Sequence, residues 1–151
     1  MGKVRFREQQ HTETLAMAVV AFVAVVEGYM ACNTWNLLRP IGIMHALMAA
    51  VAFVIAILLS RFTITVTETH LTFGFGPFRK RMPLADVRRA HMVECSLRTT
   101  GVGIHYVAGY WAWVARTGPA VQIILKSGKP LGFIISTSRP RDLSAILNNE
   151  T

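Results

Sequence analysis

Residues 14–60 read TLAMAVVAFVAVVEGYMACNTWNLLRPIGIMHALMAAVAFVIAILLS, and this stretch decides the fold. It holds two apolar runs: 14–32, whose one charged residue is Glu27, and 41–60, whose only titratable residue is His45. At about 1.5 Å of rise per residue, a helix as long as either run extends about 28–30 Å, which matches a hydrocarbon core. The sequence therefore predicts a hairpin of two transmembrane helices over residues 14–60.

The residues between and around these runs predict the topology. The link 33–40 is short, and Pro40 is tolerated in the first turn of a helix. A second apolar run so soon after the first argues against a cleaved signal peptide. The link carries only Arg39, whereas basic residues flank the hairpin at Lys3, Arg5, Arg7, Arg61, Arg79, Lys80, Arg81, Arg88 and Arg89. Because basic residues favour the cytoplasmic side, we expect a two-pass protein of the cell inner membrane with both termini in the cytoplasm.

The totals limit what lies outside the hairpin. Of 151 residues, 104 lie outside residues 14–60, which is enough for one small domain. We expect residues 1–13 to be a cytoplasmic N-terminal segment and 61–151 to be a cytoplasmic domain. The formal charge of +8 fits positive-inside topology, anionic lipid or nucleic acid as explanations. Cys32 and Cys95 fall on opposite sides of the predicted membrane, so no disulfide is expected.

After Arg61 the pattern alternates, with Phe62, Ile64 and Val66 on one face of FTITVT and threonines on the other. This alternation predicts a half-buried strand, followed by LTFGF at 71–75 and a turn at Gly76-Pro77. We predict further strands at 79–82, 87–94, 103–107, 110–115, 121–125 and 131–136, with a hairpin turn at 126–129. Residues 138–147 predict one amphipathic helix, with a serine cap and a proline in its first turn.

Two segments carry a resemblance to a known family. They are FTITVTETHLTFGFGPFRKRMPLADVRRAHMVE at 62–94 and VQIILKSGKPLGFIISTSRPRDLSAIL at 121–147. Their order of strands, basic turn, late hairpin and terminal helix resembles the bacterial pleckstrin-homology-like (PH-like) domains of small membrane proteins. The resemblance implies an α+β membrane protein, in which a PH-like small β-barrel or sandwich of about seven strands with a C-terminal helix follows the hairpin. It implies no catalytic residue and no cofactor.

The chain departs from this family pattern in two ways. Residues 98–110 (RTTGVGIHYVAGY) are richer in glycine and align poorly. The lysine and arginine arrangement with which eukaryotic relatives bind phosphoinositides is not reproduced residue by residue. The resemblance therefore implies no selectivity for a lipid headgroup.

Glu27 is the most unusual residue, because a carboxylate within a membrane span is costly and usually faces protein or water. His45 lies at a matched depth on the second run, so the two side chains are expected to pair across the hairpin. Such a pair serves either a proton-linked or ion-linked site or the specificity of helix packing. Small residues allow close helix approach, and we expect helix packing through Ala24, Glu27, Gly28, His45, Ala49 and Ala52.

The basic residues are the other candidate site. We expect Arg61, Arg79, Lys80, Arg81, Arg88 and Arg89 to contact anionic lipid without headgroup selectivity, since juxtamembrane cations each gain about 1 kcal/mol near such lipid. Trp111 and Trp113 share one face of a strand, where tryptophans anchor cores or interfaces. No RNA-binding aromatic motif is present, so nucleic acid is not an expected partner.

The sequence contains no pattern that predicts catalysis. Its five histidines have neither the mutual spacing nor the cysteine partners of a zinc site, and we expect no metal. It has no nucleophile elbow, P-loop or dinucleotide-binding motif, so we expect no enzyme and no cofactor. Two functions fit: a membrane-anchored PH-like binding or scaffold protein that assembles with itself or other membrane proteins at the cytoplasmic face, or an accessory subunit of a larger membrane enzyme or transporter complex.

Overall fold

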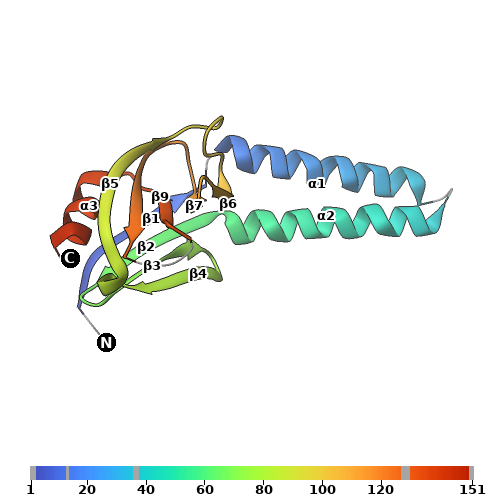
Figure 1. Cartoon of the computed structure of the whole chain (residues 1–151). Helices are drawn as coiled ribbons and strands as arrows, with labels where there is room; N and C mark the ends of the chain where they lie inside the picture. Colours follow the sequence, from blue (N-terminus) through green and yellow to red (C-terminus); the bar gives the residue numbers. More distant parts are fainter. Residues whose placement is uncertain (1–2, 13, 36–37, 127–129, 150–151) are drawn as a thin grey trace. The chain divides into compact units, whose positions relative to one another are not determined.

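The computed structural model describes residues 3–12, 14–35, 38–126 and 130–149 (Figure 1). The chain divides into a helical hairpin, Thr14–Ser60, and a second unit made of Met1–Glu13 together with Arg61–Thr151. We call the second unit the β domain. It is discontinuous in sequence, because the hairpin is inserted between its first strand and the rest.

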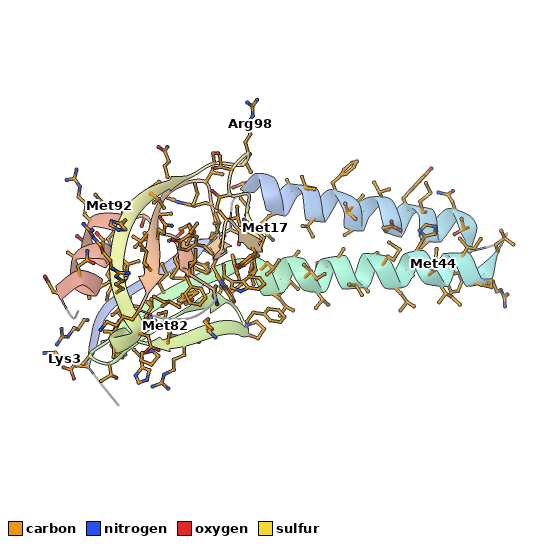
Figure 2. All side chains as sticks on the ribbon, in the orientation of Figure 1. Lys3, Met17, Met44, Met82, Met92 and Arg98 are labelled. Atoms are coloured by element: carbon orange, nitrogen blue, oxygen red, sulfur yellow. The ribbon has the colours of Figure 1, made fainter. Side chains whose placement is uncertain are left out.

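The hairpin consists of α1 (Thr14–Thr34) and α2 (Arg39–Leu59). Both helices are long and apolar enough to cross a membrane. The two predicted runs are helical, and the helix ends differ from the predicted ends by at most two residues. Most of the large apolar side chains that are described on these helices are exposed, and Figure 2 shows side chains projecting from both helices. Pro40 lies in the first turn of α2, as expected. The link residues 36–37 lie outside the described part of the chain.

The first sheet of the β domain, sheet A, has the strand order β1-β2-β3-β4, with all pairs antiparallel. Its strands are β1 (Val4–His11), β2 (Arg61–Thr67), β3 (His70–Phe75) and β4 (Phe78–Pro83). The predicted alternation of β2 is confirmed, since Phe62, Ile64 and Val66 are fully buried. Strand β4 crosses close over Gly74, where a Cβ atom would lie 2.0 Å from the Phe78 carbonyl oxygen, so a side chain at this position is excluded.

Strand β1 is a difference from the sequence-based expectation, which left residues 1–13 outside the domain. The segment VRFREQQH pairs with β2 from Val4 opposite Thr67 to His11 opposite Arg61, with one register shift between Val4 and Phe6. Its buried positions are Phe6, Glu8 and Gln10, of which two are polar. The segment therefore lacks the alternation of apolar residues by which a half-buried strand is recognised.

Sheet B has the strand order β5-β8-β9-β7-β6. A short 3₁₀ turn, Leu84–Asp86, leads from sheet A into β5 (Val87–Cys95), and the remaining strands are β6 (Gly103–Val107), β7 (Tyr110–Val114), β8 (Gly118–Leu125) and β9 (Gly132–Ser136). Strands β7 and β9 are parallel, and the other neighbours are antiparallel. Strands β8 and β9 pair as predicted for a hairpin, although residues 127–129 of the predicted turn lie outside the described chain.

The inward faces of the two sheets form an aromatic core. Phe73 of sheet A contacts Trp113 and Phe133 of sheet B, with ring centroids 5.5 and 5.3 Å apart. The C-terminal helix α3 (Pro140–Asn149) packs on β5 and β8 and buries Leu143 and Leu147. The structure is thus an α+β chain with two sheets and a terminal helix, as the sequence predicted in outline.

Candidate functional site

The two helices of the hairpin meet along a seam of small residues. On α1 the less exposed positions include Ala24, Glu27, Gly28 and Ala31, and on α2 they include Gly42, His45, Ala49, Ala52 and Ala56. The α2 positions alternate in steps of three and four residues, which keeps one stripe of a helix against a straight or gently coiled neighbour. All six residues expected to take part in helix packing are among the less exposed positions, but a Cβ atom on Gly28 would meet no other atom within 4 Å.

Glu27 and His45 are in direct contact across the seam. His45 Nδ1 lies 2.5 Å from Glu27 Oε2, and the two side chains are 22% and 19% exposed. The expected pairing is therefore present, and it joins the only carboxylate of the hairpin to its only imidazole. Burial of either group alone in an apolar surrounding would be costly, and the contact gives each a hydrogen-bonding partner.

The close approach of the helices occurs at Gly42 rather than at Gly28. A Cβ atom on Gly28 would meet no other atom within 4 Å. At Gly42 the same atom would lie 3.1 Å from the Trp35 Cα atom and 3.3 Å from the Ala31 carbonyl oxygen. Gly42 is the buried residue of α2, so it is the glycine that lets the tip of the hairpin close.

The structure divides the predicted basic residues among different faces. Strand register places Arg7, Thr65, Thr72 and Arg81 in one row across the outward face of sheet A. A second row contains Gln9, Thr63, Gly74 and Arg79, and a third pairs His11 with Arg61. We call these three rows the outer basic face. Its four arginines are exposed, and none of its members is acidic.

The outer basic face begins where the hairpin joins the β domain. Arg61 directly follows Ser60, and its carbonyl oxygen accepts a hydrogen bond of 3.1 Å from the Gly76 amide. Arg79 donates from Nε to the Gly76 carbonyl oxygen at 2.8 Å, so it belongs to the same end of sheet A. The sequence predicts no lipid contact for Arg7, the remaining arginine of this face, because local pattern does not reveal that residues 4–11 form a strand.

The other predicted basic residues lie elsewhere. Lys80 is paired with Phe73, and strand parity places it on the inward side of sheet A. Arg88 and Arg89 open β5, which starts after Pro83 at the far end of β4 from Arg79. Basic residues that are close in sequence thus lie on different faces. Lys80 points away from its neighbours because side chains alternate along a strand, and Arg88 and Arg89 belong to another sheet.

A buried carboxylate that the sequence did not predict ties β1 to the start of α3. Glu8 accepts hydrogen bonds from the Ser138 amide at 2.8 Å, from the hydroxyls of Ser138 and Thr137, and from Gln10 Nε2 at 2.8 Å. Burial raises the pKa of Glu8, but these hydrogen bonds together outweigh it and hold the pKa below its ordinary value. Thr137 and Ser138 lie 129 and 130 residues away in sequence, so no local pattern points to them.

The other titratable residues of the described part of the chain were compared with the ligand sets that hold metal ions. No group of three or more histidine, cysteine or acidic residues there is suited to a metal ion. Burial raises the pKa of the Cys95 thiol and lowers the pKa of His105, so both favour the neutral form. Cys32 is exposed and Cys95 is buried, and neither forms a disulfide.

Trp111 and Trp113 share the inward face of sheet B, as strand parity predicted. Trp113 packs against Phe73 and Phe75, whereas Trp111 is 41% exposed and contacts Tyr106 edge to face. Trp113 is thus half-buried at the border of the aromatic core, and Trp111 is exposed beside it.

No family model, curated protein or solved structure matches this chain.

Proposed function

We propose that this chain is a non-enzymatic, membrane-anchored binding or scaffold protein that holds its β domain at the cytoplasmic face of the inner membrane. The observation that carries the proposal is the insertion of the hairpin between β1 and β2, which are paired neighbours in one sheet. His11 is opposite Arg61, so both ends of the hairpin leave one end of sheet A. Both ends of a spanning hairpin would then lie on the same side of the membrane.

Charge supports the cytoplasmic assignment and a role at the lipid surface. The outer basic face carries four exposed arginines and no acidic residue, and its Arg61 end adjoins the hairpin. Cations held beside anionic headgroups gain about 1 kcal/mol each. This face is an electrostatic contact for anionic lipid without a shaped headgroup pocket, in a domain that we propose to be PH-like.

An accessory subunit of a larger membrane complex is the second candidate, and a surface of the hairpin favours it. A groove of about 370 Å³ along α1 and α2 is lined by apolar side chains and by Glu27. A helix of another membrane protein seated there would cover the apolar side chains and part of the Glu27–His45 pair. Such contacts between helices rely on packing and polar side chains.

The topology is tested by labelling single cysteines in intact cells, in a Cys32→Ser background. A cysteine replacing Trp35 should react with a membrane-impermeant maleimide added outside, because Trp35 is at the tip of the hairpin. Cysteines replacing Lys3 or Asn149 should react only after the cells are opened. Labelling at either terminal site in intact cells would contradict the proposal.

The two candidate functions are separated by purification in a mild detergent. Sizing-column chromatography with mass spectrometry should give this polypeptide alone, or its homo-oligomer, if the chain is a self-contained scaffold. Foreign chains in fixed stoichiometry would favour the accessory subunit. Their loss in a Val51→Asn variant, which alters the groove along α1 and α2, would place the contact there.

A further inference from the structure

An apolar groove opens between the two sheets of the β domain, on the side of their edge strands β4 and β6. It has a volume of about 340 Å³ and is lined by Lys80, Ile104, Trp111, Trp113, Pro130 and Phe133. Register places Ile104 beside Trp113 and Trp111 beside Phe133 on one face of sheet B, and Lys80 faces them from sheet A. The ring contacts of Phe73 with Trp113 and Phe133 give this groove a packed aromatic wall.

The polar side-chain groups among these lining residues are hydrogen-bond donors only. The indole N–H of Trp113 is buried and has no hydrogen-bond partner. No water-sized sphere touches this nitrogen, so an acceptor in the groove reaches it only if the Trp113 ring turns. A buried donor without an acceptor costs about 1–3 kcal/mol, and this penalty favours that turn when an acceptor is present. The ammonium group of Lys80 adds up to three more donors and a positive charge, and none of the described residues that line the groove is acidic.

The size and chemistry of the groove define its ligand. Since a water molecule occupies about 30 Å³, 340 Å³ corresponds to about eleven non-hydrogen atoms. The lining requires an apolar body against tryptophan, isoleucine and phenylalanine side chains, and an anionic acceptor for the indole and the lysine. A medium-chain carboxylate has both features, and its two oxygens can accept from both donors.

We propose that this groove binds a medium-chain fatty acid, with its carboxylate between Lys80 and the Trp113 indole and its hydrocarbon chain against Trp111, Ile104 and Phe133. Octanoate, with ten non-hydrogen atoms, is the matching probe. The site belongs wholly to the β domain and does not depend on the lipid contact of the outer basic face.

The test follows the indole N–H signal of Trp113 by NMR while octanoate is added to the full-length protein in phosphatidylcholine nanodiscs. The signal is assigned with a Trp113→Phe variant, because the chain has three tryptophans. Octanoate should shift it saturably to lower field, as expected when the N–H gains an acceptor. Octan-1-ol partitions into the same bilayer but lacks the charge, and should bind about tenfold more weakly.

The matched variants are Lys80→Met and Arg81→Met, which remove one charge each from neighbouring residues of β4. Lys80→Met should weaken octanoate binding about tenfold, because it removes a charge-assisted hydrogen bond. Arg81 faces the opposite side of sheet A, so Arg81→Met should leave the dissociation constant within about twofold. The absence of a saturable shift, equal binding of octanol and octanoate, or equal losses in the two variants would each overturn the proposal.

Discussion

At the scale of the residue, Glu8 shows how one side chain joins distant parts of the chain. Its carboxylate accepts hydrogen bonds from Gln10 on β1 and from Thr137 and Ser138, which lie just before the terminal helix. Gln10 Nε2 also donates to the Ser136 carbonyl oxygen at 2.9 Å. Because the pKa of Glu8 is lower in the folded than in the unfolded protein, the unfolded chain takes up this proton first as the pH falls.

The first prediction concerns the Glu8→Gln variant. It should lower the free energy of unfolding of the β domain by about 1–3 kcal/mol at neutral pH, because hydrogen bonds to a charged acceptor are lost. The stabilisation by Glu8 is complete above the ordinary pKa of 4.5 and disappears as the pH falls through the lower pKa of the folded state. The difference between wild type and variant should therefore shrink below pH 4.5.

Urea unfolding of the full-length protein in nanodiscs measures this effect. Fluorescence of Trp111 and Trp113 in a Trp35→Phe background reports on the β domain alone. The control is Glu94→Gln, which removes the same charge from an exposed position on β5. A wild-type-minus-variant difference that is the same in acid as at neutral pH would show that the ionised form of Glu8 is not the stabilising one.

The second prediction concerns the pair Glu27 and His45. In a double-mutant cycle, Glu27→Gln and His45→Ala should be coupled by more than about 0.5 kcal/mol, because the two side chains share one hydrogen bond. The unfolding free energy of the full chain in mixed micelles is the measured quantity. A control cycle of Glu27→Gln with Tyr29→Phe, at an exposed position, should be additive within about 0.5 kcal/mol. Additivity in the first cycle would leave Glu27 free to serve a partner.

At the scale of the element, the hairpin needs one of its glycines for packing and not the other. Gly28 has open space at its Cβ position, whereas Gly42 is enclosed by Trp35 and Ala31. Glycine in a helix interior is about 1 kcal/mol less favourable than alanine, so its presence requires a local reason. Only Gly42 has that reason in the packing of α1 against α2.

The third prediction compares the two glycines. Gly28→Ala should stabilise the hairpin by up to about 1 kcal/mol, because helix propensity improves and no contact is disturbed. Gly42→Val should destabilise it by about 1–3 kcal/mol, because the added atoms press on the Trp35 backbone and the Ala31 carbonyl. Both changes are read from unfolding in mixed micelles. Loss of stability in Gly28→Ala would mean that a partner helix or a second copy occupies that space.

At the scale of the whole molecule, the β domain and the hairpin are separable because the insertion point is a pair of neighbouring strands. The ends of β1 and β2 already meet at His11 and Arg61, as they would in an ordinary β-hairpin. A two-residue Asn-Gly turn joins such strands without strain.

The fourth prediction follows from this connection. Replacing residues 12–60 by Asn-Gly should give a water-soluble, folded β domain, judged by a cooperative thermal transition and a single sizing-column peak. Residues 61–151 alone are the control. They lack β1, so they lose the Glu8 hydrogen bonds and the buried Phe6 side chain, and should aggregate or unfold. Equal stability of the two proteins would show that β1 is dispensable.

The fifth prediction applies this soluble domain to lipid. It should bind vesicles containing anionic lipid, and binding should weaken as salt shortens the Debye length from about 10 Å at 0.1 M to about 3 Å at 1 M. Replacing Arg79 and Arg81 by glutamine should weaken binding about tenfold or more, whereas the same change at Arg88 and Arg89 should have less than about a twofold effect. Preference for one anionic headgroup over another of equal charge would reveal a specific pocket.

The sequence alone determined the features that depend on local pattern. Two long apolar runs predicted α1 and α2, because each is long enough to cross a hydrocarbon core as a helix, and alternation predicted β2. The matched depth of Glu27 and His45 predicted their contact, since an antiparallel hairpin pairs positions equally far from its tip. Turn residues and a capping pattern likewise predicted the positions of the later strands and of α3.

The tertiary structure alone decided the features that depend on distant partners. The segment of β1 becomes a strand because β2 offers a free edge and because Ser138 and Thr137 satisfy Glu8, and neither reason is present in residues 4–11 themselves. The run Arg79–Arg81 appeared as one basic cluster, but strand alternation sends Lys80 to the inward groove and leaves its neighbours on the outer basic face. Pairing and side-chain direction are properties of the assembled sheet, so a chain read in order does not contain them.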